Sequence, residues 1–230
     1  MLAIALAAAL STATPDATRL PEGTWCYALT ATKDGASQVV GHTFQSLERT
    51  THAGKPAIEI VVHQRMGAKF DMRDVFVLDA KTLRPFEVTN TRFGKPHVRD
   101  VYAGTGVTEM RWDDAGKETT SNKPLAKPVW EGNLFGLMFA ALPLRAGDEY
   151  AIPFFQYDKG EGTFDIKVTG ERDIDTPLGK RHAIVLQAGP TGSQAEYLIG
   201  AKPRIELGYT AGPFGQALAP SCAAFEAATK

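Results

Sequence analysis

The chain has 230 residues, of which 43% are hydrophobic and 22% are charged, so it holds enough apolar material for a sizeable core. Its 25 Lys and Arg residues nearly balance its 26 Asp and Glu residues, and no block of like charge occurs. Such a chain has no electrostatic footprint for nucleic acid or an anionic membrane surface, and we expect neither as a partner.

The N-terminus carries an apolar segment, Leu2–Leu10, that is too short to span a bilayer but suits the core of a secretory signal peptide. Ser11-Thr12-Ala13 follows, with small residues at the −3 and −1 positions of a cut. The alternative is a buried N-terminal helix, which Pro15 disfavours. We therefore expect a signal peptide at 1–13, a mature chain at 14–230 without a membrane span, and a periplasmic or otherwise exported location.

Two cysteines, Cys26 and Cys222, lie near the two ends of the mature chain. In an oxidising compartment an even pair is typical of a disulfide, which here would tie the first strand to the C-terminal tail. The alternative is two unrelated buried thiols. With no other cysteine, and with none of the five histidines at ligand spacing, we expect no metal site and no cofactor.

The first half of the mature chain reads as strands separated by turns that contain Gly or Pro, at spacings of about eight to twelve residues. The strands are rich in aromatic and β-branched residues, and several alternate apolar with polar side chains. They are expected at 24–32, 38–47, 57–66, 71–78, 86–93, 98–103 and 107–112. The polar stretch 113–128 is the candidate for a loop or weak hairpin and for an internal boundary.

The segment Val129–Leu142 is the one convincing helix of the mature chain. Its apolar residues fall most of the way round the helix, which is typical of a buried helix rather than of one on a wet surface. Pro143 follows and ends it.

Strands return in the second half, where 162–172 alternates apolar and polar residues most regularly. The others are expected at 149–157, 180–187, 194–200 and 204–209, and the Gly- and Pro-rich segment 208–220 is expected to be irregular. The predicted fold class is therefore mainly β. It is a single domain with a strongly curved antiparallel sheet, or an open barrel, of roughly 11–12 strands around the buried apolar helix at about 129–142.

Five short motifs occur in an order that resembles a known family. They are Asp-x-x-Thr-Leu-Arg-Pro at 79–85, Leu-Pro-Leu at 142–144, Ala-Gly-Asp-x-Tyr at 146–150, Thr-Pro-x-Gly-x-x-x-Ala at 176–183 and Tyr-Leu-x-x-x-x-x-Arg at 197–204. Together they resemble a large family of secreted, β-rich bacterial proteins known only as a domain of unknown function. The resemblance covers roughly residues 24–210. It implies a periplasmic or outer-membrane location and a β-rich fold, and it supplies no catalytic residues.

Catalytic motifs are absent from the sequence. No Gly-x-Ser-x-Gly occurs, and Gly160-Glu161-Gly162 lies between strands rather than before a helix, so it reads as a hairpin turn. Carboxylate pairs such as Asp71 with Asp74 are interpreted as solvated surface. We name no catalytic residue and favour a protein that is not an enzyme.

Aromatic residues cluster around the expected helix and the strand that follows it. Packing in the core is the usual role of such residues, and lining of an apolar ligand cavity is the alternative. The residues selected as cavity lining are Trp130, Phe135, Phe139, Tyr150 and Phe154.

Three functions remain open from the sequence. We favour a non-enzymatic binding or carrier protein for an apolar small molecule or lipid, because the chain combines export, one apolar helix and many aromatic residues. The first alternative is an envelope assembly or structural protein that binds another envelope protein. The second is a hydrolase acting on envelope polymers, which would need an acidic pair in a cleft with at least one raised pKa.

Overall fold

The computed structural model describes residues 14–190 and 192–227, and the predicted signal peptide lies outside this part of the chain. The described residues fold mainly into β-structure, as predicted, and fifteen strands form one sheet. This sheet is open, because its first and last strands do not pair with each other. No helix in the described ranges is long and apolar enough to cross a membrane.

Neighbouring strands of the sheet follow one another closely in sequence. From one edge the order is β8 (Glu118–Pro124), β7 (Gly106–Trp112), β6 (Lys95–Ala103), β5 (Pro85–Arg92), β4 (Asp71–Asp79), β3 (Lys55–Arg65), β2 (Ala36–His52) and β1 (Gly23–Lys33). It continues through β15 (Phe214–Leu218), β14 (Glu206–Ala211), β13 (Ala195–Gly200), β12 (Gly179–Pro190), β11 (Gly160–Thr176), β10 (Glu149–Gln156) and β9 (Trp130–Glu131). All pairs are antiparallel except β9 with β10.

The sheet contains three strands that were not among the predicted eleven or twelve, namely β8, β9 and β15. Strand β8 is polar and lies at an edge, where its charged and hydroxyl side chains suit exposure to solvent. Strand β9 has only two residues, and β15 falls within the segment expected to be irregular.

Tight turns connect the hairpins of the first half. In the β1–β2 turn Asp34 and Gly35 have φ angles of 52° and 78°. Two successive positive φ angles are typical of the type I′ turn, whose twist matches that of the flanking strands. The turn signal in the sequence therefore corresponds to a defined backbone geometry.

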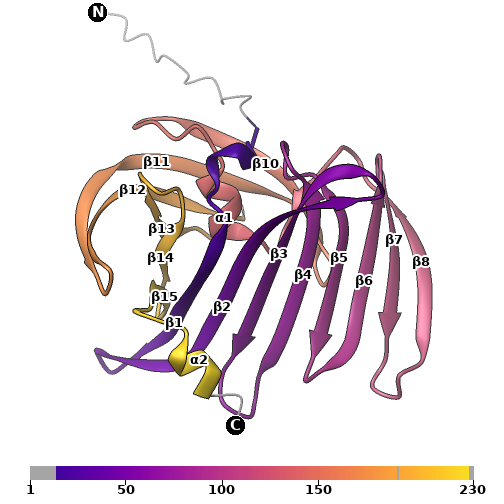
Figure 1. Cartoon of the computed structure of the whole chain (residues 1–230), viewed down its shortest axis with the longest axis horizontal. Helices are drawn as coiled ribbons and strands as arrows, with labels where there is room; N and C mark the ends of the chain where they lie inside the picture. The colour runs from indigo at the N-terminus through magenta and orange to yellow at the C-terminus, as the bar shows by residue number, and fades with distance from the viewer. Residues whose placement is uncertain (1–13, 191, 228–230) are drawn as a thin grey trace, which may run out of the picture.

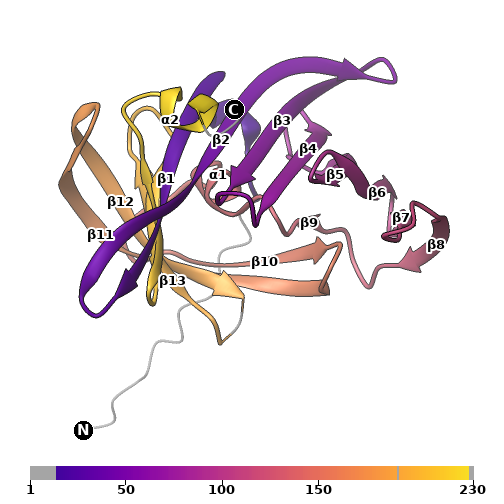
Figure 2. The ribbon, with the colours of Figure 1, turned by 90° about the horizontal axis from the view of Figure 1, so that it is seen from below.

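The sheet curls around the helix α1 (Phe135–Ala140), with β1–β4 on one side of the helix and β10–β13 on the other (Figures 1 and 2). Helix α1 is fully buried except for its first residue, and the main core forms between it and the concave face of the sheet. A regular alternation explains part of this core, since Phe164, Ile166 and Val168 of β11 are at most 2% exposed.

Helix α1 is shorter than the predicted span of about 129–142. Trp130 pairs with Phe154 of β10, so the chain is still extended there. A Cβ atom at Gly132 would overlap the Phe154 ring, which shows how closely the backbone approaches β10 at this point. Pairing with β10 therefore replaces the first turn of the predicted helix.

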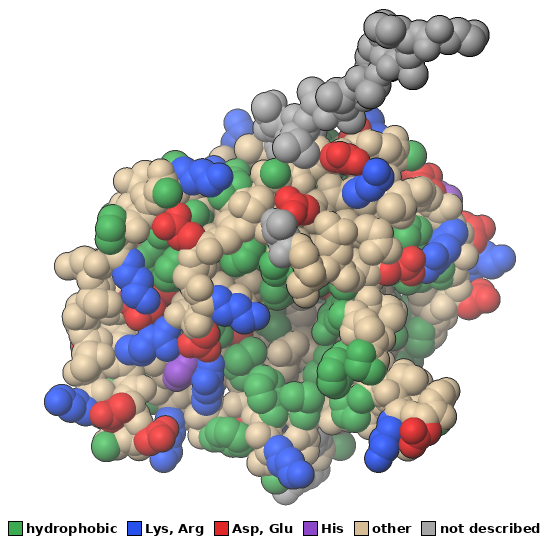
Figure 3. Space-filling model, turned by 180° about the vertical axis from the view of Figure 1, so that it is seen from behind, with side chains coloured by type: hydrophobic (Ala, Val, Ile, Leu, Met, Phe, Trp, Pro, Cys, Tyr) green, Lys and Arg blue, Asp and Glu red, His purple; other side chains and the backbone are tan. Residues whose placement is uncertain are grey.

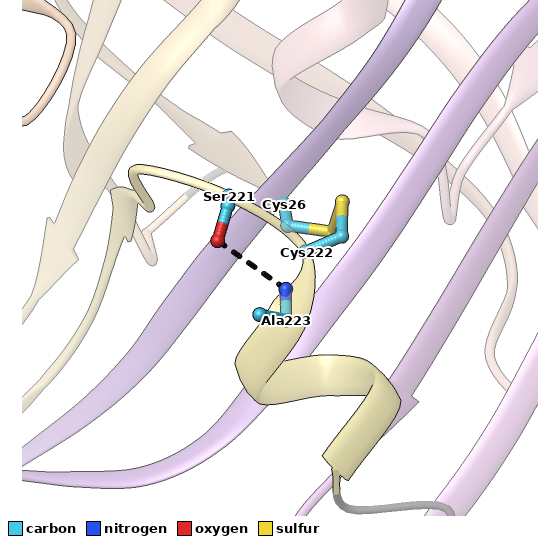
Figure 4. The surroundings of a disulfide bond; sticks show 4 residues. All are labelled: Cys26, Ser221, Cys222 and Ala223. Carbon is cyan, nitrogen blue, oxygen red and sulfur yellow. Dashed lines mark hydrogen bonds between the residues drawn. A yellow bond between two sulfur atoms is a disulfide. The ribbon is translucent and has the colours of Figure 1, made fainter.

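A disulfide joins Cys26 of β1 to Cys222, as predicted, and closes a sequence separation of 196 residues (Figure 4). Cys222 lies just before the second short helix, α2 (Ala223–Ala227). The Phe225 ring of α2 packs 5.6 Å from that of Phe44, on the face of β2 opposite α1. The disulfide thus anchors the C-terminal segment to the convex face of the sheet. A short 3-10 helix, η1 (Ala17–Arg19), precedes β1.

Candidate functional site

The aromatic residues predicted to line a cavity divide into a core group and one exception. The core group is at most 5% exposed and consists of Trp130, Phe139, Tyr150 and Phe154. Phe154 stacks on Phe164 with ring centroids 4.1 Å apart, and Phe139 meets the same ring edge-on at 5.6 Å. The exception is Phe135 at the start of α1, which borders a cavity.

Two members of the core group are held by hydrogen bonds to the protein itself. The Nε1 atom of Trp130 donates to the carbonyl of Thr82 at 2.9 Å. The hydroxyl of Tyr150 lies 2.7 Å from the Asp148 carboxylate and 3.0 Å from the carbonyl of Pro143. Their polar atoms therefore stabilise the core packing, as is usual for buried Trp and Tyr.

A cavity of about 330 Å³ lies between the concave face of the sheet and the N-terminal end of α1. The face of the molecule behind β1 and β2 is hollowed near its centre, with hydrophobic side chains gathered beside the hollow (Figure 3). Strands β2, β3, β4, β10, β13, β14 and β15 contribute to the cavity wall together with the segment that leads into α1. Eight of its sixteen described lining residues are polar.

A β-bulge in β14 directs two side chains into this cavity. The register with β13 shifts between Leu198 and Ile199, which leaves Leu207 as the extra residue of β14. In a regular strand, residues three positions apart face opposite sides of the sheet. The bulge instead allows both Glu206 and Tyr209 to line the cavity, and bulges commonly re-aim side chains in this way next to sites.

Hydrogen bonds link the polar side chains of one wall, which come from the four strands β14, β15, β2 and β3. The amide of Gln216 donates to Oε1 of Glu206 at 2.8 Å, and the Gln216 oxygen accepts from the hydroxyl of Thr43 at 3.0 Å. The amide of Gln64 in turn approaches the Thr43 hydroxyl at 3.4 Å. This network fixes Glu206 while leaving its other oxygen, Oε2, without a hydrogen bond from any described residue.

Burial determines the charge state of Glu206. The side chain is 5% exposed, and loss of hydration raises its pKa to about 7, while the hydrogen bond from Gln216 opposes this rise. Oε2 lies against the start of α1, where a Cβ atom at Gly136 would overlap it. The titratable groups beside it are Tyr27, Tyr197 and Tyr209. Burial raises their pKa values, and the Glu206 charge raises them further.

A second acid, Asp74 of β4, lines the same cavity. Its interpretation as solvated surface was wrong, because it is 2% exposed. Its Oδ1 atom accepts hydrogen bonds from the amide of Asn90 at 2.7 Å and from the hydroxyl of Tyr157 at 3.0 Å. Burial is the dominant influence and raises the pKa of Asp74 to about 6.

A third buried acid, Glu131, does not line the cavity but holds one of its lining residues by hydrogen bonds. Glu131 of β9 is fully buried, and burial raises its pKa to about 8. It accepts hydrogen bonds from the Tyr102 hydroxyl at 2.9 Å and from the backbone N–H of Asn133 at 3.0 Å. The Asn133 side chain, which borders the cavity, accepts a hydrogen bond from Gln156 at 2.6 Å. Glu131 thus positions Asn133, the polar residue in the segment that leads into α1.

The charged lining of the cavity is entirely acidic. None of its described lining residues is Lys, Arg or His, whereas Asp74 and Glu206 both contribute carboxyl groups. No group of three or more His, Cys, Asp or Glu side chains within residues 14–190 and 192–227 is arranged to hold a metal ion. The cavity therefore favours hydrogen-bond donors and organic cations over anions.

Sequence reasoning missed these polar residues, although an indication was present. Asp74 shares a strand face with Phe76 and Leu78, both fully buried, so alternation placed it on the core side. Thr43 and Gln45 similarly precede the buried Leu47 on one face of β2. Polar residues at inward positions of a regular strand were the signal that could have identified the site.

Comparison with known proteins identifies a family and no relative of known function. A family model described as "Protein of unknown function (DUF3108)" matches residues 26–210, which agrees with the resemblance found in the sequence. No curated protein and no solved structure matches the chain.

Proposed function

The chain belongs to the DUF3108 family, whose function is unknown, and we propose that it is an exported, non-enzymatic binding or carrier protein that holds one small amphipathic molecule beneath α1. The observation that carries this proposal is the cavity of about 330 Å³, in which eight polar residues meet an equal number of apolar, aromatic and glycine residues. Ligand sites are usually concave and largely pre-formed, with a few convergent polar groups. The wall around Glu206 and Gln216 has this character.

Export is supported by the disulfide as well as by the apolar N-terminal segment. Disulfides form and persist in oxidising compartments such as the periplasm and are rare in the cytosol. The Cys26–Cys222 disulfide fits such a compartment.

The size of the cavity narrows the ligand class. Ligand cavities range from about 300 to 1,000 Å³, so this one lies at the low end. Such a volume suits a small molecule or one short alkyl chain rather than a complete diacyl lipid. Leu134, Leu137 and Val62 offer the apolar part of the lining for such a chain.

Calorimetric titration with 1-octanol, a neutral amphiphile of suitable size, tests the proposal. The disulfide-bonded protein should bind one molecule saturably. Val62→Trp, which fills the cavity, should weaken binding at least tenfold. Val61→Trp is the matched control, because this neighbouring side chain faces the opposite side of β3. Absence of saturable binding, together with native mass spectra showing only the bare polypeptide, would refute the proposal.

A hydrolase is the second candidate, because two buried acids with raised pKa values line one cavity. Acid–base catalysis by two carboxyl groups generally needs environments that push their pKa values apart. Here burial raises the pKa of both Asp74 and Glu206, so the arrangement favours binding over turnover. If an envelope polymer is cleaved by the wild-type protein but not by the Asp74→Asn or Glu206→Gln variant, the hydrolase is the correct function.

A further inference from the structure

We propose that the ligand carries an organic ammonium group, which Glu206 and the rings of Tyr197 and Tyr209 receive at one end of the cavity. This inference rests on the proposed binding function and specifies the chemistry of the ligand. It concerns a small free amine with a short apolar portion.

Glu206 is the first element of the ammonium site. It is 5% exposed and faces the cavity, and its Oε2 atom accepts no hydrogen bond from any described residue. No cationic side chain lines the described part of the cavity to neutralise this carboxyl group. A buried carboxylate is expected to be paired, and a ligand ammonium would supply both the opposite charge and a donor for Oε2.

Two tyrosines form the second, independent element. Tyr197 of β13 and Tyr209 of β14 are register partners, and their ring centroids lie 5.3 Å apart with the planes tilted by 35°. Both rings border the same cavity as Glu206, and the bulge at Leu207 is what brings Tyr209 there. Aromatic rings attract ammonium groups through their negative faces, most strongly at sites shielded from water.

The remaining lining residues disfavour a ligand that carries a carboxylate, phosphate or alcohol group in place of an ammonium group. A carboxylate or phosphate would meet Asp74 and Glu206 with no Lys, Arg or His among the described lining residues to offset the repulsion. A phospholipid amine brings its phosphate with it and is disfavoured for the same reason. A neutral alcohol is tolerated by the amide side chains but leaves the Glu206 charge unpaired.

Titration calorimetry with three molecules of equal chain length tests this inference. The disulfide-bonded wild-type protein is titrated at pH 8 with octylamine, 1-octanol and octanoate, each below its micelle concentration. Octylamine should bind at least tenfold more tightly than 1-octanol, and octanoate should bind most weakly. Between pH 8 and pH 6 the affinity for octylamine should fall at least about tenfold as Glu206 takes up a proton, with Asp74 of the same cavity beginning to do so near pH 6, whereas the affinity for octanol should not change.

Variants distinguish a specific ammonium site from a general apolar cavity. Glu206→Gln should bring octylamine to within twofold of octanol while leaving octanol binding unchanged. Tyr209→Phe should keep the preference for the amine, and Tyr209→Leu should reduce it. The exposed substitution Glu118→Gln on β8 is the matched control and should alter neither ligand.

Each result supports the inference or overturns it. Equal binding of octanol and octylamine, or an amine preference that survives Glu206→Gln, overturns the ammonium site while the binding function stands. Failure of all three molecules to bind a folded protein removes the binding function and the inference together. Displacement of octylamine by phosphatidylethanolamine vesicles would overturn the assignment to a free amine.

Discussion

Replacement of Glu206 by glutamine should stabilise the protein by an amount that grows as the pH rises from 4.5 to 7 and is constant above about pH 8. The side chain is buried in the folded state, where loss of hydration raises its pKa from an ordinary 4.5 to about 7. Glutamine has the same shape as the protonated acid and can keep the hydrogen bond to Gln216. The substitution therefore removes the charge without removing the packing.

The pKa values fix the size and sign of the effect. Between pH 4.5 and pH 7 the folded protein holds a proton on Glu206 that the unfolded chain has released, so the free energy of unfolding falls as pH rises. The difference between the two pKa values, at about 1.4 kcal/mol per unit, corresponds to about 3 kcal/mol above pH 8. Glu206→Gln should recover most of this amount at pH 8 and almost none at pH 4.5.

Urea unfolding of the disulfide-bonded protein, followed by tryptophan fluorescence at pH 4.5, 6, 7 and 8, measures the difference between wild type and variant. Asp74 and Glu131 also have raised pKa values, so the wild type alone does not isolate Glu206. The exposed control Glu118→Gln should change the free energy by less than about 0.5 kcal/mol at any pH. A Glu206→Gln variant with the same stability as wild type at pH 8, or one destabilised equally at every pH, would refute the reasoning.

Three further predictions concern the fold around the site. Gly136→Ala places a methyl group onto the Glu206 carboxylate and should lower the free energy of unfolding by about 2–3 kcal/mol. In Gly106→Ala, where a Cβ atom meets nothing closer than 3.6 Å, the change should stay below about 1 kcal/mol, and equal effects in urea unfolding would contradict this account. Asp100→Asn should stabilise by at least about 1 kcal/mol at pH 8, because both carboxylate oxygens are buried without partners; a less stable variant would show that the charge is compensated. Reduction of the disulfide opens a 196-residue separation and should cost about 5 kcal/mol, and an unchanged urea midpoint with reductant would exclude this role.

The fold was largely predictable because its strands alternate and its turns have clear signals. In β11 the three apolar residues Phe164, Ile166 and Val168 face the core as the period of two requires. Strand β8 was not predicted because its sequence has no apolar face and none of its residues is buried. It is extended because it pairs with β7 at the edge of the sheet. The predicted helix was too long for a similar reason, since pairing of Trp130 with β10 is not visible in local hydrophobicity.

The cavity was less predictable because it depends on long-range convergence. Thr43 and Gln216 share a hydrogen bond although 173 positions separate them in the chain. The bulge at Leu207 is a property of the pairing between β13 and β14, and it alone accounts for Tyr209 facing the same side as Glu206. Large aromatic residues were a poor indicator of the position of the cavity, because rings such as Phe154 pack closely in the core. The cavity lies instead where polar side chains line the concave face and leave space unfilled.

Two kinds of buried acid lie on the concave face, and the difference between them indicates where function resides. Asp100 has no hydrogen-bond partner for either oxygen and does not line the cavity. Its burial therefore destabilises the fold without contributing to the candidate site. Glu206 lines the cavity with one oxygen held by Gln216 and the other without a hydrogen bond from any described residue, and a bulge in its strand brings an aromatic ring beside it. Departures from the rule that buried charges are paired are expected mainly at functional sites. The contrast with Asp100 therefore supports our proposal that Glu206 binds the cationic group of a ligand.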